Sequence, residues 1–174
     1  MKTWHNLLAF AIVLLAGGFF HVSAQGFPFK DFERRTLKEI VAINESEDVE
    51  DRKRLPSQNR VIMRGKILSS VVRVTYVGES RPIGAERKKF IELWAGSYFS
   101  ENPGYASHYE SEFLFKEATD EYWLPVQKQV ASYFPKELQK GDTIDLYLIR
   151  PGGLSTKEKT DWVFLVEEFL KPKE

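Results

Sequence analysis

A change in hydrophobic period after residue 60 restricts the fold of this 174-residue chain more than any other feature. Hydrophobic and polar residues alternate through Val61–Ile67 and again through Val72–Tyr76, which is the pattern of strands with one buried face. Gly65, and Ser69 with Ser70, provide points at which one long strand can bend. The sequence therefore predicts a mainly β domain over residues 60–170.

The rest of this domain predicts further strands and one helix. Strands are expected over Lys89–Trp94 and Tyr109–Phe115, then around Ile144–Leu148 after Gly141 and Asp142, and finally over Trp162–Val166. A helix is expected after Pro125, because Val126, Val130, Tyr133 and Phe134 fall on one helical face. The stretch from Pro151 through Gly152 and Gly153 to Thr160 predicts a hairpin loop. The side chains expected in the core are Val74, Ile144, Leu146, Trp162 and Phe164.

This order of elements has a long first strand, a helix between the third and fourth strands, and Gly141-Asp142 opening the fourth. It resembles the OB-fold, a five-stranded Greek-key barrel. The resemblance covers roughly residues 60–170 and rests on element order alone. An α+β sheet of the cystatin or NTF2-like kind is the alternative, because a helix is expected before the strands.

That first helix is predicted over residues 29–43, where Phe29, Phe32, Leu37, Ile40 and Val41 fall near one stripe. The chain from Asn44 to Asn59 is mostly charged and predicts a solvated linker. The expected organisation is thus residues 25–59 as helix and linker, residues 60–170 as the β domain, and residues 171–174 as a tail.

The first 24 residues have the layout of a secretory signal peptide. Lys2 is followed by an uncharged apolar run of about 14 residues, and Val22-Ser23-Ala24 provides a cleavage site before Gln25. An uncleaved membrane anchor is the alternative, but the run is shorter than the ~20 residues that span a bilayer. We expect a secreted or periplasmic protein of bacterial origin, with no transmembrane segment in the mature chain.

Composition excludes several chemistries. The 25 basic and 25 acidic residues balance, which argues against a nucleic-acid partner. There is no cysteine, and His108 is the single histidine after residue 24, so no metal site, cofactor or nucleophilic triad is predicted. We therefore expect a non-enzymatic protein with no catalytic residues.

Two charged features receive structural interpretations. Glu110 and Glu112 are expected on the outward face of one strand, where alternate acids usually only contact solvent; a hydrolase using them or His108 is an alternative. The basic run Arg87–Lys89 is expected to be a solvated entry to a strand.

Aromatic residues in and beside the Gly/Pro/Asn-rich stretch 95–107 are the most informative cluster. Tyr and Trp combine an apolar face with a polar tip, which suits a protein interface or a sugar-stacking surface. The predicted partner is a protein or envelope component, with a small ligand or glycan as the alternative. The equally simple interpretation is that these rings fix a long loop to the barrel. The candidate binding residues are Trp94, Tyr98, Phe99, Tyr105 and Tyr109.

Overall fold

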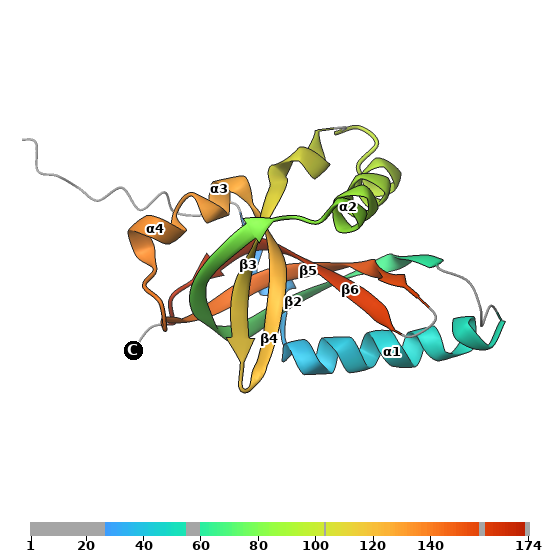
Figure 1. The fold of residues 1–174 in the computed structure, drawn as a ribbon, viewed down its shortest axis with the longest axis horizontal. Coiled ribbons are helices and arrows are strands. Elements are labelled where there is room, and N and C mark those ends of the chain that lie inside the picture. Colours follow the sequence, from blue (N-terminus) through green and yellow to red (C-terminus); the bar gives the residue numbers. More distant parts are fainter. Residues whose placement is uncertain (1–26, 55–59, 103, 157–158, 173–174) are drawn as a thin grey trace, which may run out of the picture.

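A closed five-stranded β-barrel forms the centre of the protein (Figure 1). The computed structural model describes residues 27–54, 60–102, 104–156 and 159–172. Its barrel strands run in the order β2-β3-β4-β6-β5, and β2 pairs back with β5; β4 and β6 are parallel, whereas the other barrel neighbours are antiparallel. The strands are β2 (Arg60–Pro82), β3 (Tyr109–Glu117), β4 (Asp120–Gln127), β5 (Thr143–Ser155) and β6 (Thr160–Leu170).

The predicted OB-like barrel is confirmed. Two short helices, α3 (Lys128–Ala131) and α4 (Phe134–Glu137), lie between its third and fourth strands, and the closed sheet decides against the cystatin or NTF2-like alternative. The long first strand is also confirmed, because β2 runs for 23 residues with a register shift between Met63 and Leu68. It pairs with β5 along its first part and with β3 along its last part, which closes the barrel.

The barrel interior contains the core residues expected from the alternation. All five predicted side chains are at most 9% exposed: Val74, Ile144, Leu146, Trp162 and Phe164. A second core lies on the outer face of β5 and β6, where Ile149, Val163 and Leu165 pack against α2 (Ala85–Tyr98). Alternate residues of β6 thus contribute to two different cores, which is the period-two geometry of a strand covered on both faces.

Helix α2 corrects the strand predicted over Lys89–Trp94. Its buried residues are Phe90, Ile91, Trp94 and Ala95, and their i, i+1, i+4, i+5 spacing is helical. The strand that fills the barrel instead is β4, where Tyr122, Leu124 and Val126 face the interior. The predicted helix after Pro125 therefore begins only at Lys128. The strand predicted over Lys89–Trp94 is a helix, and β4 was not predicted as a strand, so the predicted number of barrel strands is still correct.

Helix α1 (Leu37–Arg54) begins later and ends later than predicted. It begins at a capping box, in which the Thr36 hydroxyl accepts from the Glu39 amide at 3.0 Å and the Glu39 carboxylate accepts from the Thr36 amide at 2.6 Å. It continues through the predicted linker as far as Arg54, because Asn44 and Asp48 are buried against the sheet. Only residues 55–59 of that linker lie outside the described residues.

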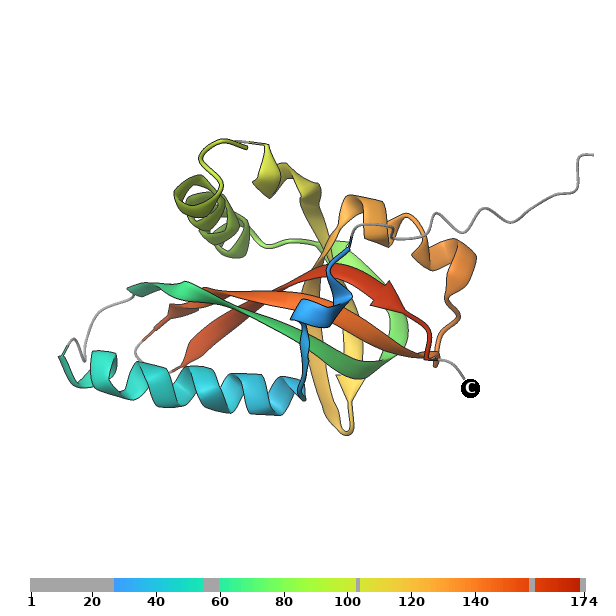
Figure 2. The same ribbon diagram turned by 180° about the vertical axis from the view of Figure 1, so that it is seen from behind.

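The segment before α1 is not helical along its length. It forms the 3₁₀ turn η1 (Phe29–Asp31) and the two-residue strand β1 (Glu33–Arg34), which pairs with β2. Phe29 and Phe32 pack their rings against Tyr147 of β5, at centroid distances of 4.9 and 5.5 Å. From behind, this segment lies against the outside of the barrel before the chain turns into α1 (Figure 2).

The predicted hairpin loop after Pro151 is largely strand. Gly152 and Gly153 lie inside β5. Glycine is required at both positions because neighbouring backbones approach too closely for a side chain. A Cβ on Gly152, whose φ is +140°, would lie 1.8 Å from the Ile62 carbonyl oxygen, and one on Gly153 would lie 2.6 Å from that of Asp161. The connection from β5 to β6 therefore shortens to the residues between Ser155 and Thr160.

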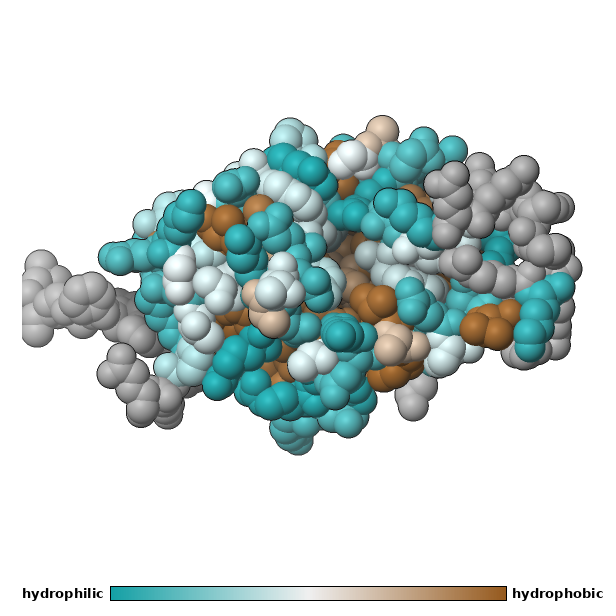
Figure 3. All heavy atoms as spheres, turned by 60° about the horizontal axis from the view of Figure 1, so that its bottom comes forward, coloured by the Kyte–Doolittle hydropathy of each residue, from teal (hydrophilic) through white to brown (hydrophobic). Residues whose placement is uncertain are grey.

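The predicted signal peptide lies outside the described residues. Within the described ranges, no helix is both long and apolar enough to cross a bilayer. The face that carries α1 is mainly hydrophilic, with hydrophobic residues in small separate patches (Figure 3).

Candidate ligand-binding cleft

A cleft of about 320 Å³ opens on the outer face of β3, where the chain leaves β2 for α2. It is bordered by the β2–α2 junction and by the ends of β5 and β6 that flank their connection. On OB-like barrels, the second and third strands and these two connections form the usual ligand face. We call this site the outer cleft; its lining residues are Arg81, Gly84, Ala85, Glu86, Arg87, Glu112, Leu154 and Asp161.

Glu112 is buried in the outer cleft, with only 2% of its surface exposed. It points outward from β3 as predicted, but its expected contact with solvent is corrected, because Arg81 and Arg87 cover it and each donates to one carboxylate oxygen. Glu110 is exposed and forms an ion pair with Lys128. The two glutamates therefore have separate partners and do not form a carboxylate pair.

Arg87 connects three strands to the first turn of α2. Its guanidinium donates to the Asp161 carboxylate at 2.7 and 2.8 Å through Nη2, and to the Trp123 carbonyl oxygen at 3.1 Å, besides its bond to Glu112. Burial alone would lower the pKa of Arg87, but the hydrogen bonds and charges of Asp161 and Glu112 outweigh it and raise that pKa. The predicted solvated strand entry is therefore wrong at this residue.

Arg81 and Trp123 form the aromatic wall beside the outer cleft. The Arg81 guanidinium carbon lies 4.0 Å from the centroid of the Trp123 ring, a close cation–π stack. Half of the Arg81 side chain remains exposed, at 50%. A planar polar group on an aromatic ring therefore faces solvent next to the cleft.

The predicted aromatic binding residues lie together elsewhere, in and beside the connection between the first two barrel strands, β2 and β3. Trp94 and Tyr109 are only 0% and 1% exposed, whereas Tyr98 is 37% exposed. The half-buried rings of Phe99 and Tyr105 stack at 4.2 Å, and Trp94 contacts both. These contacts make most of the cluster a packed unit beneath α2 and the 3₁₀ turn η2 (Tyr105–His108), with Tyr98 at its surface.

The hydroxyls of Tyr105 and Tyr109 converge on Glu167 of β6. Tyr105 donates to its carboxylate at 3.0 Å, and Tyr109 and Gln127 also donate to it. Burial raises the pKa of Glu167 despite these hydrogen bonds, and burial together with the Glu167 charge raises the pKa of both tyrosines. The polar tips of Tyr105 and Tyr109 are thus occupied within the protein.

The remaining candidate chemistry is sparse in the described part of the chain. His108 is exposed, and its ring lies 5.7 Å from that of Tyr105. Across the described residues, no three His, Cys, Asp or Glu side chains are grouped so that they could hold a metal ion.

Comparison with known proteins does not assign a function to this site. No protein family, curated protein or solved structure matches this chain.

Sequence reasoning missed the cleft residues Arg81, Arg87 and Asp161, and Trp123 beside the cleft. Trp123 alternates with Tyr122 and Leu124, so recognising β4 as a strand would have placed it on the outer face. The pairing of Arg87 with Asp161 has no local signal, because 74 positions separate the two residues.

Proposed function

We propose that the chain is an exported, non-enzymatic binding module that takes a neutral carbohydrate in the outer cleft. The N-terminal signal-peptide pattern supports export. The observation that carries the ligand class is the charge of the cleft lining, where two arginines, Arg81 and Arg87, meet three acids, Glu86, Glu112 and Asp161. Arg87 lies between Glu112 and Asp161, and Arg81 bonds to Glu112. The cleft therefore has no basic excess to attract a polyanion such as a nucleic acid.

A sugar ring fits the remaining chemistry. Its hydroxyls can donate to the half-exposed Asp161 carboxylate and accept from Arg81, and its C–H face can pack on the Arg81–Trp123 stack. The cavity volume falls within the range of small-ligand sites, and oligosaccharides are among the ligands of OB-like barrels.

A panel of neutral oligosaccharides tests this proposal by thermal unfolding. A bound sugar raises the unfolding midpoint as its concentration rises, and Trp123→Ala should remove that rise. Tyr98→Ala is the matched control, because it removes an aromatic ring outside the outer cleft. The absence of a shift across the panel, or a shift that Trp123→Ala preserves, would overturn the proposal.

A protein partner is the second candidate, supported by a small exposed apolar patch near the end of α2. Val61, Met63 and Tyr98 are 47%, 42% and 37% exposed, and the Tyr98 hydroxyl donates to the Arg64 carbonyl oxygen of β2 at 2.7 Å. Val61 and Met63 alternate with buried Ile62, so they share one face of β2.

Affinity capture from the native host separates this second candidate from the first. An envelope protein enriched by the wild type, lost with Met63→Ser plus Tyr98→Ser and retained with Trp123→Ala, would establish the patch as its site. Equal capture by all three proteins would exclude the patch.

A further inference from the structure

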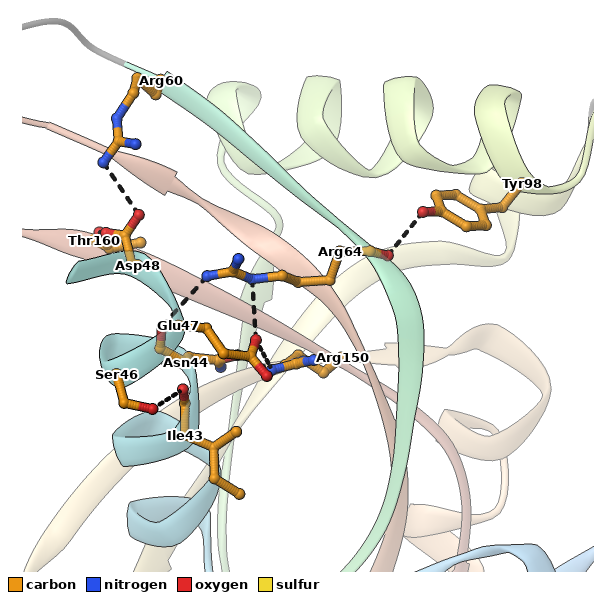
Figure 4. Close-up of polar contacts among 10 residues, drawn as sticks. All are labelled: Ile43, Asn44, Ser46, Glu47, Asp48, Arg60, Arg64, Tyr98, Arg150 and Thr160. Carbon is orange, nitrogen blue, oxygen red and sulfur yellow. Dashed lines mark hydrogen bonds and ion pairs between the residues drawn. The ribbon is translucent and has the colours of Figure 1, made fainter. Parts of the chain in front are cut away.

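The second half of α1 packs on the sheet through polar side chains. Early in the helix Leu37 and Ile40 are fully buried in the barrel core, but one and two turns later Asn44 and Asp48 occupy the same face at 0% and 1% exposure. Their partners project from β2, β5 and β6 (Figure 4). We call this region the α1 seam, formed by Asn44, Glu47, Asp48, Arg64, Arg150 and Trp162.

Arg150 is the most buried cation of the α1 seam, with 3% of its surface exposed. Its Nη1 donates to the Asn44 side-chain oxygen and to the Glu47 carboxylate, the latter at 2.9 Å. The same Glu47 oxygen lies 3.4 Å from Nε of Arg64, so one carboxylate serves two guanidinium groups. Burial lowers the pKa of Arg150, and the neighbouring charges of Arg64 and Arg35 lower it further, against the opposite effect of Glu47.

The other acid of the seam is already engaged. Asp48 accepts from Arg60 at 3.1 Å, and Thr160 lies within 3.5 Å of its second oxygen. The Asp48 carboxylate therefore pairs with Arg60 and Thr160. Among the described residues, Glu47 is the carboxylate that pairs with Arg150, and 43% of its side chain is exposed.

Several buried N–H donors of the seam have no acceptor among the described residues. They are Nε of Arg150, Nδ2 of Asn44 and Nε1 of Trp162. The Arg64 guanidinium lies over the Trp162 ring, 5.5 Å from its centroid. A second cation therefore lies beside one of these donors. Buried polar groups are normally paired, and every unpaired group here is a donor, so the seam is suited to a group rich in acceptors.

We propose that the α1 seam binds a small oxyanion, held by Arg150 and Arg64 with the Asn44 amide. Planar guanidinium groups match the oxygens of a phosphate or a carboxylate, and their charge-assisted hydrogen bonds are the strong ones. The exposed Glu47 carboxylate is the internal competitor, and the anion reaches Arg150 by displacing it. The site lies on the face of β6 opposite the outer cleft, and its failure would leave the carbohydrate proposal intact.

Thermal unfolding of the full-length protein tests this site at pH 7, with sodium phosphate compared with sodium chloride at equal ionic strength. Millimolar phosphate should raise the unfolding midpoint of the wild type. Arg150→Lys keeps the charge but removes the guanidinium fork, and should weaken phosphate binding about tenfold or more. Glu47→Gln removes the competitor and should tighten binding about two- to fivefold.

Arg73→Lys is the matched control, because it also replaces a guanidinium that pairs with a carboxylate, that of Asp145, but Arg73 lies outside the seam. It should leave the phosphate effect unchanged. If Arg150→Lys does not fold, the gain expected from Glu47→Gln still decides the test.

Two results would overturn the proposal. One is no phosphate dependence in either the wild type or Glu47→Gln. The other is an equal shift in all variants, because excluded salts stabilise folded proteins in general. Sodium acetate in a parallel series distinguishes the source of the oxyanion: a specific effect of phosphate alone identifies an inorganic anion, and an equal effect of acetate identifies a carboxylate.

Discussion

Helices α1 and α2 cover opposite faces of the same sheet with different chemistry (Figure 1). Helix α2 buries Phe90, Ile91 and Trp94 against the outer face of β5 and β6. Helix α1 begins in the same way with Leu37 and Ile40, but its second half buries Asn44 and Asp48 against arginines. Apolar burial is non-directional and independent of pH, whereas a buried ionic contact stabilises only when each charge is matched.

This difference predicts that the attachment of α2 to the sheet is independent of solution conditions, whereas that of the second half of α1 depends on them. Beyond its first turn, where Arg87 pairs with Glu112 and Asp161, the packing of α2 should hold under all conditions that preserve the barrel core. Packing of the second half of α1 should respond to anions and to the charges of the seam. The segment that leads into α1 depends on charge as well, because Arg34 of β1 pairs with Asp145 of β5 at 2.9 Å.

The largest effect is expected on the apolar side. Trp94→Ala removes a fully buried ring between α2 and η2 and should lower the free energy of unfolding by about 3–5 kcal/mol. Urea unfolding measures this loss. A cost below about 1 kcal/mol would mean that the aromatic cluster is not part of the core.

An intermediate effect is expected where the segment leading into α1 is tied to the barrel. Hydrogen bonds from Arg73, outweighing burial and aided by Arg34, lower the pKa of Asp145 from 3.8 to about 2. A lowered pKa gives stability that is present above pH 3.8 and is lost as the pH falls through 2. Because both arginine partners are more than half exposed, solvent screens these ion pairs, and Asp145→Asn should cost about 1–2 kcal/mol at pH 7.

Urea unfolding of the wild type and Asp145→Asn between pH 7 and pH 2 measures this contribution. The difference between the two proteins should be constant down to about pH 4 and then shrink. A difference that stays constant to pH 2 would show that the charge of Asp145 does not stabilise the fold.

A smaller effect is expected at the start of α1. Thr36→Ala removes the hydroxyl that accepts from the Glu39 amide and should cost about 1 kcal/mol. Hydrogen exchange should show the loss as faster exchange in the first turn of α1, with α2 unchanged. Equal acceleration in both helices would contradict their independent attachment.

The smallest effect is expected at Glu167 and appears as a pH dependence. Burial raises its pKa above 4.5, so the stability associated with its neutral form is present below pH 4.5 and is lost as the pH rises through the raised pKa. In Glu167→Gln this loss should be absent. Parallel pH profiles of the two proteins would show that Glu167 titrates normally.

The sequence predicted the barrel because its interior follows a local rule. Alternation in β2, β3, β5 and β6 identified both the strands and their buried faces. Helix α2 was missed because strand and helix patterns overlap in a short apolar run such as residues 90–94. The Thr36-x-x-Glu39 capping box was a readable signal for the start of α1.

Neither the outer cleft nor the α1 seam could be predicted from local patterns. Glu112 appeared as an exposed acid because Arg81 covers it only once β2 pairs with β3, and Arg87 covers it only once α2 docks. Arg150 and Asn44 are 106 positions apart, and the charges around Asn44 are typical of a solvated linker until the sheet arranges arginines opposite them. Contacts between distant charges depend on the assembled fold.

The carbohydrate proposal depends on where a ligand contacts the protein, and the indole N–H signals of the three tryptophans after residue 24 report this directly by NMR. Titration with the oligosaccharide that gives the largest thermal shift should move the signal of Trp123, beside the outer cleft, and leave that of buried Trp94 unchanged. Movement of the Trp94 signal with Trp123 unaffected would contradict the account and place the ligand at the aromatic cluster.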